Sequence, residues 1–321
     1  MGEGSATTAA APGRPPLIVV GGPTATGKTA LGVELALAIA GAGRPAEVIS
    51  ADSRQVYRGM DVGTAKPTLA ERRGVPHHGL DLVEPDQPFS VADFVAHAEG
   101  ALADLAARAG VALLIGGTGL WIRALAGGLP LDDLPFDPAL RAALEADLAR
   151  DGLAALVERL ERAAPRLAGS VDRRNPRRVV RALEIATLAG DAPRPAPRGY
   201  AGPLLRIGLD VADHAVHRSW IARRAESQLA GGILEEAATL RVRFDPGLPA
   251  FSAIGYREAW DLLDGRLDRA AYLEVNVRRN VAFARRQRTW FRREPVDLAL
   301  DAADPAVVAR ARAAVTAFAG A

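Results

Sequence analysis

The order of hydrophobic and polar positions along the chain predicts short buried strands separated by helices. Residues 17–21, LIVVG, form a continuous apolar run that is typical of a buried parallel strand. A glycine-rich turn and a helical segment, TALGVELALAIA, follow this run. Further strands are expected at 47–50, 111–115, 204–211 and 296–300. Strands that alternate with helices predict an α/β fold of the P-loop NTPase type, a parallel sheet flanked by helices.

The pattern changes between residues 125 and 200, which are helical and rich in Ala, Leu, Arg and Glu. This stretch ends in DAPRPAPRG, 191–199, whose prolines are typical of a linker or mobile loop. We therefore expect a helical insertion domain at 125–200, within a catalytic core formed by 16–124 and 201–321. Residues 1–15 are small, polar and proline-containing, and we expect a disordered tail there.

Composition narrows the classes of protein that fit. The 321 residues include no cysteine, which excludes disulfides and cysteine-based zinc sites. No apolar run approaches the roughly 20 residues that span a membrane, and the first residues lack the pattern of a signal peptide. We expect a cytoplasmic monomer. The net charge is only +2, but five arginines fall in 173–181 and seven in 278–293, and such clusters suit phosphate-rich partners.

A phosphate-binding motif follows the first predicted strand. The sequence GPTATGKT satisfies the pattern G-x4-G-K-[ST] and lies between a predicted strand and a predicted helix, the context in which the motif binds polyphosphate. Its residues are Gly22, Pro23, Thr24, Ala25, Thr26, Gly27, Lys28 and Thr29. Glycines let backbone N–H groups face an anion, Lys28 reaches the terminal phosphates, and the Thr29 hydroxyl can bind Mg²⁺. The strand at 111–115 ends in Gly116-Gly117-Thr118 rather than in the acid of an ordinary ATPase, which leaves room for a diphosphate leaving group.

Asp52 comes directly after the second predicted strand, at the sheet edge that faces ligands in open α/β folds. A carboxylate at that position can accept a proton from a nucleophile or bind a metal ion. Asp52 or Ser53 could equally serve as a helix N-cap, so position alone leaves both interpretations open.

Several separate motifs resemble those of tRNA dimethylallyltransferases, in order and over about 17–293. They are the phosphate loop; DSRQVYRGMDVGTAKP, 52–67; PHH, 76–78, with Leu80-Asp81; FSVADF, 89–94; GGTGL, 116–120; NPRRVVRALE, 175–184; IGYRE, 254–258; and RQRTWFR, 286–292. The resemblance is to the bacterial form, since eukaryotic relatives often carry a C-terminal zinc finger. Trp220-Ile221 and Gln228 depart from the residues that the family often has there, which leaves the detail of the donor pocket open.

The resemblance implies transfer of a dimethylallyl group from dimethylallyl diphosphate to N6 of the adenosine 3′ of the anticodon, in tRNAs that read codons beginning with U. It implies catalytic roles for Asp52, as the proton acceptor, and for Thr118. Arg224 would contact diphosphate. The implied tRNA contacts are Asp52, Ser53, Arg54, Gln55, Thr118, Arg141, Arg177, Arg178, Val179, Val180, Arg181, Ser252, Ala253, Ile254, Gly255, Tyr256 and Arg257.

The last long helix carries two stripes of residues. Arg278, Arg285, Arg288 and Arg292 share a face by their spacing, and this face could follow RNA phosphates. Tyr272, Phe283 and Trp290 form a separate apolar stripe that we interpret as core packing. The pair His77-His78 shows no metal-ligand pattern with the other histidines, so we favour structural or tRNA-facing roles.

Three other functions share part of this sequence pattern. A small-molecule P-loop kinase would share the phosphate loop and Asp52 but would not need the basic insertion. An adenylate isopentenyltransferase would use the same donor with a nucleotide acceptor. A nucleotide-dependent RNA-binding protein would need neither Asp52 nor Thr118.

Overall fold

A computed structural model describes residues 13–131, 135–192 and 196–320. It contains two compact units, one formed by the described residues up to Gly127 and from Gly199 onward, the other by those of Gly128–Arg198. The expected tail, 1–15, lies outside the described residues except for 13–15. Of these, Arg14 pairs with Glu99, and the Pro15 carbonyl accepts a hydrogen bond from Tyr200.

The first unit contains a six-stranded parallel sheet in the order β3-β2-β4-β1-β5-β6. The strands are β1 (Leu17–Gly21), β2 (Ala46–Ser50), β3 (His77–His78), β4 (Val111–Gly116), β5 (Leu204–Asp210) and β6 (Leu298–Asp301). The predicted parallel sheet is confirmed. The sequence pattern did not predict β3, and β6 begins two residues later than expected.

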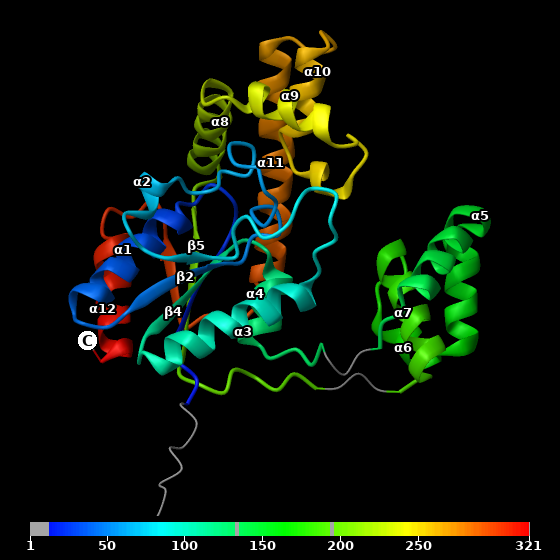
Figure 1. Ribbon diagram of the computed structural model, residues 1–321, viewed down its shortest axis with the longest axis horizontal. Coiled ribbons are helices and arrows are strands. Elements are labelled where there is room, and N and C mark those ends of the chain that lie inside the picture. The colour runs from blue at the N-terminus through cyan, green and yellow to red at the C-terminus, as the bar shows by residue number, and fades with distance from the viewer. Residues whose placement is uncertain (1–12, 132–134, 193–195, 321) are drawn as a thin grey trace, which may run out of the picture. The chain divides into compact units, whose positions relative to one another are not determined.

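Helices cover both faces of this sheet (Figure 1). Alternate residues of β1 point to opposite faces, and both sets are apolar. Ile18 and Val20 pack with α1 (Lys28–Gly41) and α12 (Val307–Ala319), whereas Leu17 and Val19 pack on the other face. The opposite side holds α3 (Val91–Ala107) and α4 (Gly119–Ala126). Strands that are buried on both faces read as continuous apolar runs, which is the pattern found in the sequence.

Further helices extend the first unit beyond the carboxyl ends of the strands (Figure 1). They are α2 (Leu69–Arg72), α8 (His214–Ala230), α9 (Ile233–Arg243), the 3-10 helix η1 (Pro249–Ser252), α10 (Tyr256–Leu263) and α11 (Arg269–Phe291). Tyr256 and Tyr272 are fully buried in the hydrophobic core that also contains α3 and α4. The long α11 therefore runs from this helical cap down to the sheet.

The second unit is helical and has a hydrophobic core of its own. It contains α5 (Pro138–Ala163), α6 (Pro165–Ser170) and α7 (Pro176–Ala189), packed around Leu160, Val179 and Leu183. Both α5 and α7 begin with a proline after a side-chain N-cap, Asp137 and Asn175. Its two chain junctions meet, since the Gly199 N–H donates to the Gly127 carbonyl at 3.1 Å and the Arg198 N–H to the Gly128 carbonyl at 2.8 Å.

Candidate active site

The phosphate loop connects β1 to α1, and two of its glycines are required by geometry. A Cβ on Gly22 would lie 1.9 Å from the Leu209 carbonyl oxygen of the neighbouring strand. Gly27 caps α1 with a φ of 79°, a left-handed conformation that other residues adopt at a cost. The loop thus places backbone N–H groups and the helix N-terminus around one space, as an anion site needs.

Lys28 lies at the first turn of α1 and lines the cavity beside this loop. Its ammonium donates a hydrogen bond to the Pro23 carbonyl. Removal from bulk water, with the nearby Arg224 charge, lowers the pKa of Lys28 to about 7, against the raising effect of Asp52 and Asp210. Lys28 and Arg224 place two positive charges close together, with too little negative charge nearby to balance them. Such an arrangement is typical of a site that binds an anion.

All three polar groups of Thr24 are bound by side chains from α8 and α11. Its N–H donates to Gln287 Oε1 at 2.7 Å, and its carbonyl oxygen lies 2.8 Å from His217 Nε2. Its hydroxyl accepts from Arg224 at 3.0 Å. His217 in turn contacts Arg288, whose Nε donates to both Asp210 oxygens at 2.9 Å. The helical cap therefore fixes the first turn of the phosphate loop.

Asp52 and Thr118 each lie two residues beyond the end of one of two neighbouring parallel strands, β2 and β4, and line one cavity. The Asp52 Oδ1 accepts the Arg54 N–H at 2.9 Å, which fixes the carboxylate. The Thr118 hydroxyl accepts the Ser53 N–H at 3.0 Å, and it makes no cap bond to α4. The two predicted catalytic side chains thus lie beside the same short turn.

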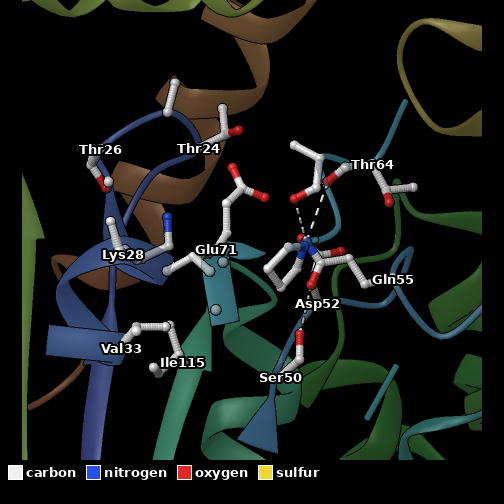
Figure 2. A pocket seen from close by; sticks show the side chains of 18 of the residues that line it. Thr24, Thr26, Lys28, Val33, Ser50, Asp52, Gln55, Thr64, Glu71 and Ile115 are labelled. Carbon is white, nitrogen blue, oxygen red and sulfur yellow. Dashed lines mark hydrogen bonds between the residues drawn. The ribbon is translucent and has the colours of Figure 1, made fainter. Parts of the chain in front are cut away.

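Two adjoining cavities contain these groups. The first, of about 460 Å³, lies against the phosphate loop and includes Lys28, Thr29 and Asp52. Figure 2 shows Lys28 on one side of this cavity and Asp52 with Gln55 on the other. The second, of about 530 Å³, includes Thr118 and apolar side chains. Seven residues line both: Thr24, Asp52, Thr64, Gly117, Arg224, Phe283 and Gln287.

Gln55 is buried, and its side chain is used within the protein. It accepts a hydrogen bond from the Ser50 hydroxyl at 2.9 Å and donates to the carbonyls of Thr64 and Ala65 (Figure 2). These bonds hold the 61–66 loop against the end of β2, and Gln55 also lines the first cavity, where the predicted tRNA contact stays a prediction.

The same loop is bound from the helical cap. Glu236 of α9 accepts three backbone N–H groups, from Asp61, Val62 and Gly63, at 2.7–3.0 Å. Its other contact is the hydroxyl of the buried Tyr256 at 2.7 Å. Gln228, which differs from the residue that the family often has at this position, donates to the carbonyls of Val62 and Gly63. Sequence reasoning gave no signal for Glu236, because the three N–H groups that it accepts lie more than 170 residues earlier in the chain.

The predicted tRNA contacts divide into exposed and buried side chains. In the second unit Arg177 and Arg178 are exposed, whereas Val179 and Val180 lie in the hydrophobic core and present no side chain to a ligand. Arg141 and Arg181 both pair with Glu184, whose side chain is fully buried.

Residues 252–257 show the same division. Ser252 and Arg257 are exposed, while Ala253, Gly255 and Tyr256 are buried. Ser252 also accepts a hydrogen bond from Arg54 at 2.9 Å and lines the second cavity.

Two predictions for α11 were wrong. Arg288 does not belong to an exposed face with Arg278 and Arg285, because it is buried against Asp210. The apolar stripe is only partly core: Tyr272 is buried, but Phe283 and Trp290 line the cavities. The described residues include no cluster of three or more histidines or acids that could hold a metal ion, and His78 pairs with Glu47.

A P-loop α/β fold whose anion cradle adjoins a second cavity with a carboxylate and a hydroxyl defines a group-transfer enzyme of the P-loop class. The sequence profile of the family described as IPP transferase matches residues 55–294, and this chain belongs to that family.

Curated relatives agree with this assignment. The chain is 47% identical over 287 residues to the tRNA dimethylallyltransferase of Anaeromyxobacter dehalogenans, which covers 87% of this chain and 92% of the relative. It is 41% identical over 301 residues to that of Burkholderia multivorans, covering 90% of each.

Solved structures show the same fold. The tRNA isopentenylpyrophosphate transferase of Bacillus halodurans is 35% identical with a TM-score of 0.69, covering 95% of this chain and 97% of that one. A eukaryotic dimethylallyltransferase acting on tRNA, at 21% identity, shares the fold with a TM-score of 0.73, over 93% of this chain and 77% of that one. No helix among the described residues is long and apolar enough to cross a membrane.

Proposed function

We propose that the protein transfers a dimethylallyl group from dimethylallyl diphosphate to N6 of the adenosine 3′ of the anticodon, in tRNAs that read codons beginning with U. The observation that carries this proposal is the shared lining of the two cavities. An anion cradle for the leaving group and a carboxylate that can accept a proton meet in one continuous space. Family membership supports the reaction class.

The phosphate loop, Lys28 and Arg224 would bind the diphosphate of the donor. As the bond between the allylic carbon and the bridging oxygen breaks, negative charge grows on the diphosphate, and fixed N–H donors and cations stabilise that charge. Arg224 is well placed for this, because its partner Thr24 belongs to the loop itself.

Magnesium fits the oxygen groups beside the loop. Thr29 lines the first cavity beside the loop, and its hydroxyl oxygen is the kind of ligand that Mg²⁺ prefers. When bound, Mg²⁺ would neutralise part of the diphosphate charge.

Asp52 would act on the acceptor. The adenine N6 forms a bond to the allylic carbon and loses a proton, which the Asp52 carboxylate accepts. Thr118 would orient the donor or acceptor from the neighbouring strand end. The Arg54 N–H holds Asp52 without neutralising its charge, so the carboxylate keeps the capacity to accept.

Exposed arginines would bind the RNA. We propose that Arg177 and Arg178 at the start of α7, and Arg257 at the start of α10, contact tRNA phosphates. The target base would leave the anticodon loop to enter the second cavity, a step that costs less in a loop than in a duplex. We further propose that the protein acts as a cytoplasmic monomer.

An isoprenyl-transfer assay tests the proposal. Purified protein, Mg²⁺ and labelled dimethylallyl diphosphate are mixed with unmodified tRNA, with AMP and ATP as competing acceptors. Label on adenosine N6 of tRNA is expected. Asp52→Asn should keep tRNA affinity and lose roughly 100-fold or more in kcat, while the exposed control Asp86→Asn keeps both. Label on AMP or ATP would instead identify an adenylate enzyme, and phosphoryl transfer to a small acceptor would identify a kinase.

A further inference from the structure

Gln287 of α11 stands at the junction of the two cavities and touches both sides of the site. Its Oε1 accepts the Thr24 N–H of the phosphate loop at 2.7 Å. Its Nε2 donates to the Gly117 carbonyl at the end of β4 at 3.0 Å. The side chain is buried, and both bonds span more than 160 residues of sequence.

The orientation of this amide is fixed by its partners. A backbone N–H can only donate and a carbonyl can only accept, so the Gln287 oxygen must face Thr24 and the nitrogen must face Gly117. A Cβ at 117 would lie 2.2 Å from Gln287 Nε2, so any other residue there would displace this amide from its two partners. One side chain therefore sets the separation between the phosphate loop and the strand end that carries Thr118.

Two consequences follow for the chemistry. The Thr24 N–H is occupied by Gln287, so it is not among the donors that the loop offers an anion. Gly117 directly precedes Thr118, whose hydroxyl accepts the Ser53 N–H beside Asp52. A shift of the amide would thus move the anion cradle relative to the proposed catalytic pair.

We propose that Gln287 is a positioning residue that ties the diphosphate cradle to Asp52 and Thr118, and that its amide, with one acceptor and one donor, is required for transfer. The proposal rests on the proposed function. Displacement of reacting groups by about 1 Å can cost roughly 100-fold in rate, so the kcat of Gln287→Leu should fall about 100-fold. Its affinity for inorganic diphosphate should fall about tenfold, because the loop loses an anchor that preorganises it.

Gln287→Glu gives a readout that a packing role would not produce. A neutral carboxylic acid copies the amide, since its carbonyl oxygen accepts from Thr24 and its hydroxyl donates to Gly117. The ionised carboxylate cannot donate and adds negative charge beside the diphosphate. The kcat of Gln287→Glu relative to wild type should therefore rise about tenfold between pH 8.5 and pH 5.5, while the ratios for Gln287→Leu and for the exposed control Gln87→Glu stay flat.

Calorimetry with inorganic diphosphate, over the same pH range, measures how the side chain at 287 affects the affinity for diphosphate without tRNA. Recovery of the diphosphate affinity of Gln287→Glu relative to that of wild type at low pH would support the positioning role even if transfer to tRNA failed. A flat ratio for Gln287→Glu in both assays, or a Gln287→Leu variant with wild-type kcat and diphosphate affinity, would overturn it. Thermal unfolding of each variant confirms that the measured protein is folded.

Discussion

Binding of diphosphate to the phosphate loop is expected to take up a proton. In the free protein, removal from water and the Arg224 charge hold the pKa of Lys28 at about 7. A bound diphosphate brings opposite charge to the same ammonium and favours its protonated form. The pKa of Lys28 should then return toward its ordinary value of 10.5.

The size of the effect follows from the two pKa values. At pH 8 only about one Lys28 in ten is protonated in the free protein, so binding should take up ~0.9 proton per site. The uptake should fall to ~0.5 proton at pH 7 and ~0.1 proton at pH 6. Above pH 7 the affinity for diphosphate should weaken by roughly tenfold per pH unit from this group alone.

Titration calorimetry measures this uptake. The binding enthalpy is recorded at pH 8 in buffers of different ionisation enthalpy, and its slope gives the number of protons exchanged. Lys28→Arg is the matched control, because a guanidinium stays charged throughout this range. Diphosphate exchanges protons of its own, so the quantity of interest is the difference between the two proteins. Equal proton exchange by wild type and Lys28→Arg would refute the assigned electrostatics.

Three further perturbations test the packing around the site. Gly63→Ala puts a Cβ 2.5 Å from the buried Tyr256 ring and should cost about 2 kcal/mol, seen as a lower Tm, whereas Gly100→Ala, in open space on α3, should not destabilise. Glu184→Gln should destabilise the helical insertion by about 2 kcal/mol, because two arginines lose a charged partner, and hydrogen exchange should localise the effect there. Burial lowers the pKa of His217, so at falling pH the unfolded state takes up a proton on this imidazole before the folded state does. The free energy of unfolding, measured by urea denaturation, should therefore fall as the pH drops below about 6.5. In His217→Gln this fall should be smaller.

Local chemistry explains which parts of the site the sequence could predict. Gly22 and Gly27 both have positive φ angles, which favour glycine locally, so the motif of the phosphate loop is readable in one short segment even though Leu209 also excludes a side chain at 22. Asp52 and Thr118 follow apolar strands, and parallel strands bring their carboxyl ends to one edge. These placements depend on neighbours in sequence or on the regular geometry of a parallel sheet.

The remaining site residues depend on long-range partners. Helical spacing grouped Arg288 with exposed arginines, but its partner Asp210 is 78 residues away at the end of β5, and the pair is buried. Gln287 likewise finds its two partners in loops from the first half of the chain. The two-residue strand His77–His78 has no apolar pattern to reveal it, because what defines it is its pairing with β2.

The hydrogen-bonded junction at Gly127–Gly199 has a consequence for how this chain could have been assembled. The first unit closes on itself at that point, so the polypeptide leaves and re-enters it through adjacent residues. Bridging two such close points with a few residues costs little conformational entropy. After a deletion of 128–198, a few residues could therefore join the two ends of the first unit. The second unit could also be replaced by another domain without changes to the fold that performs the chemistry.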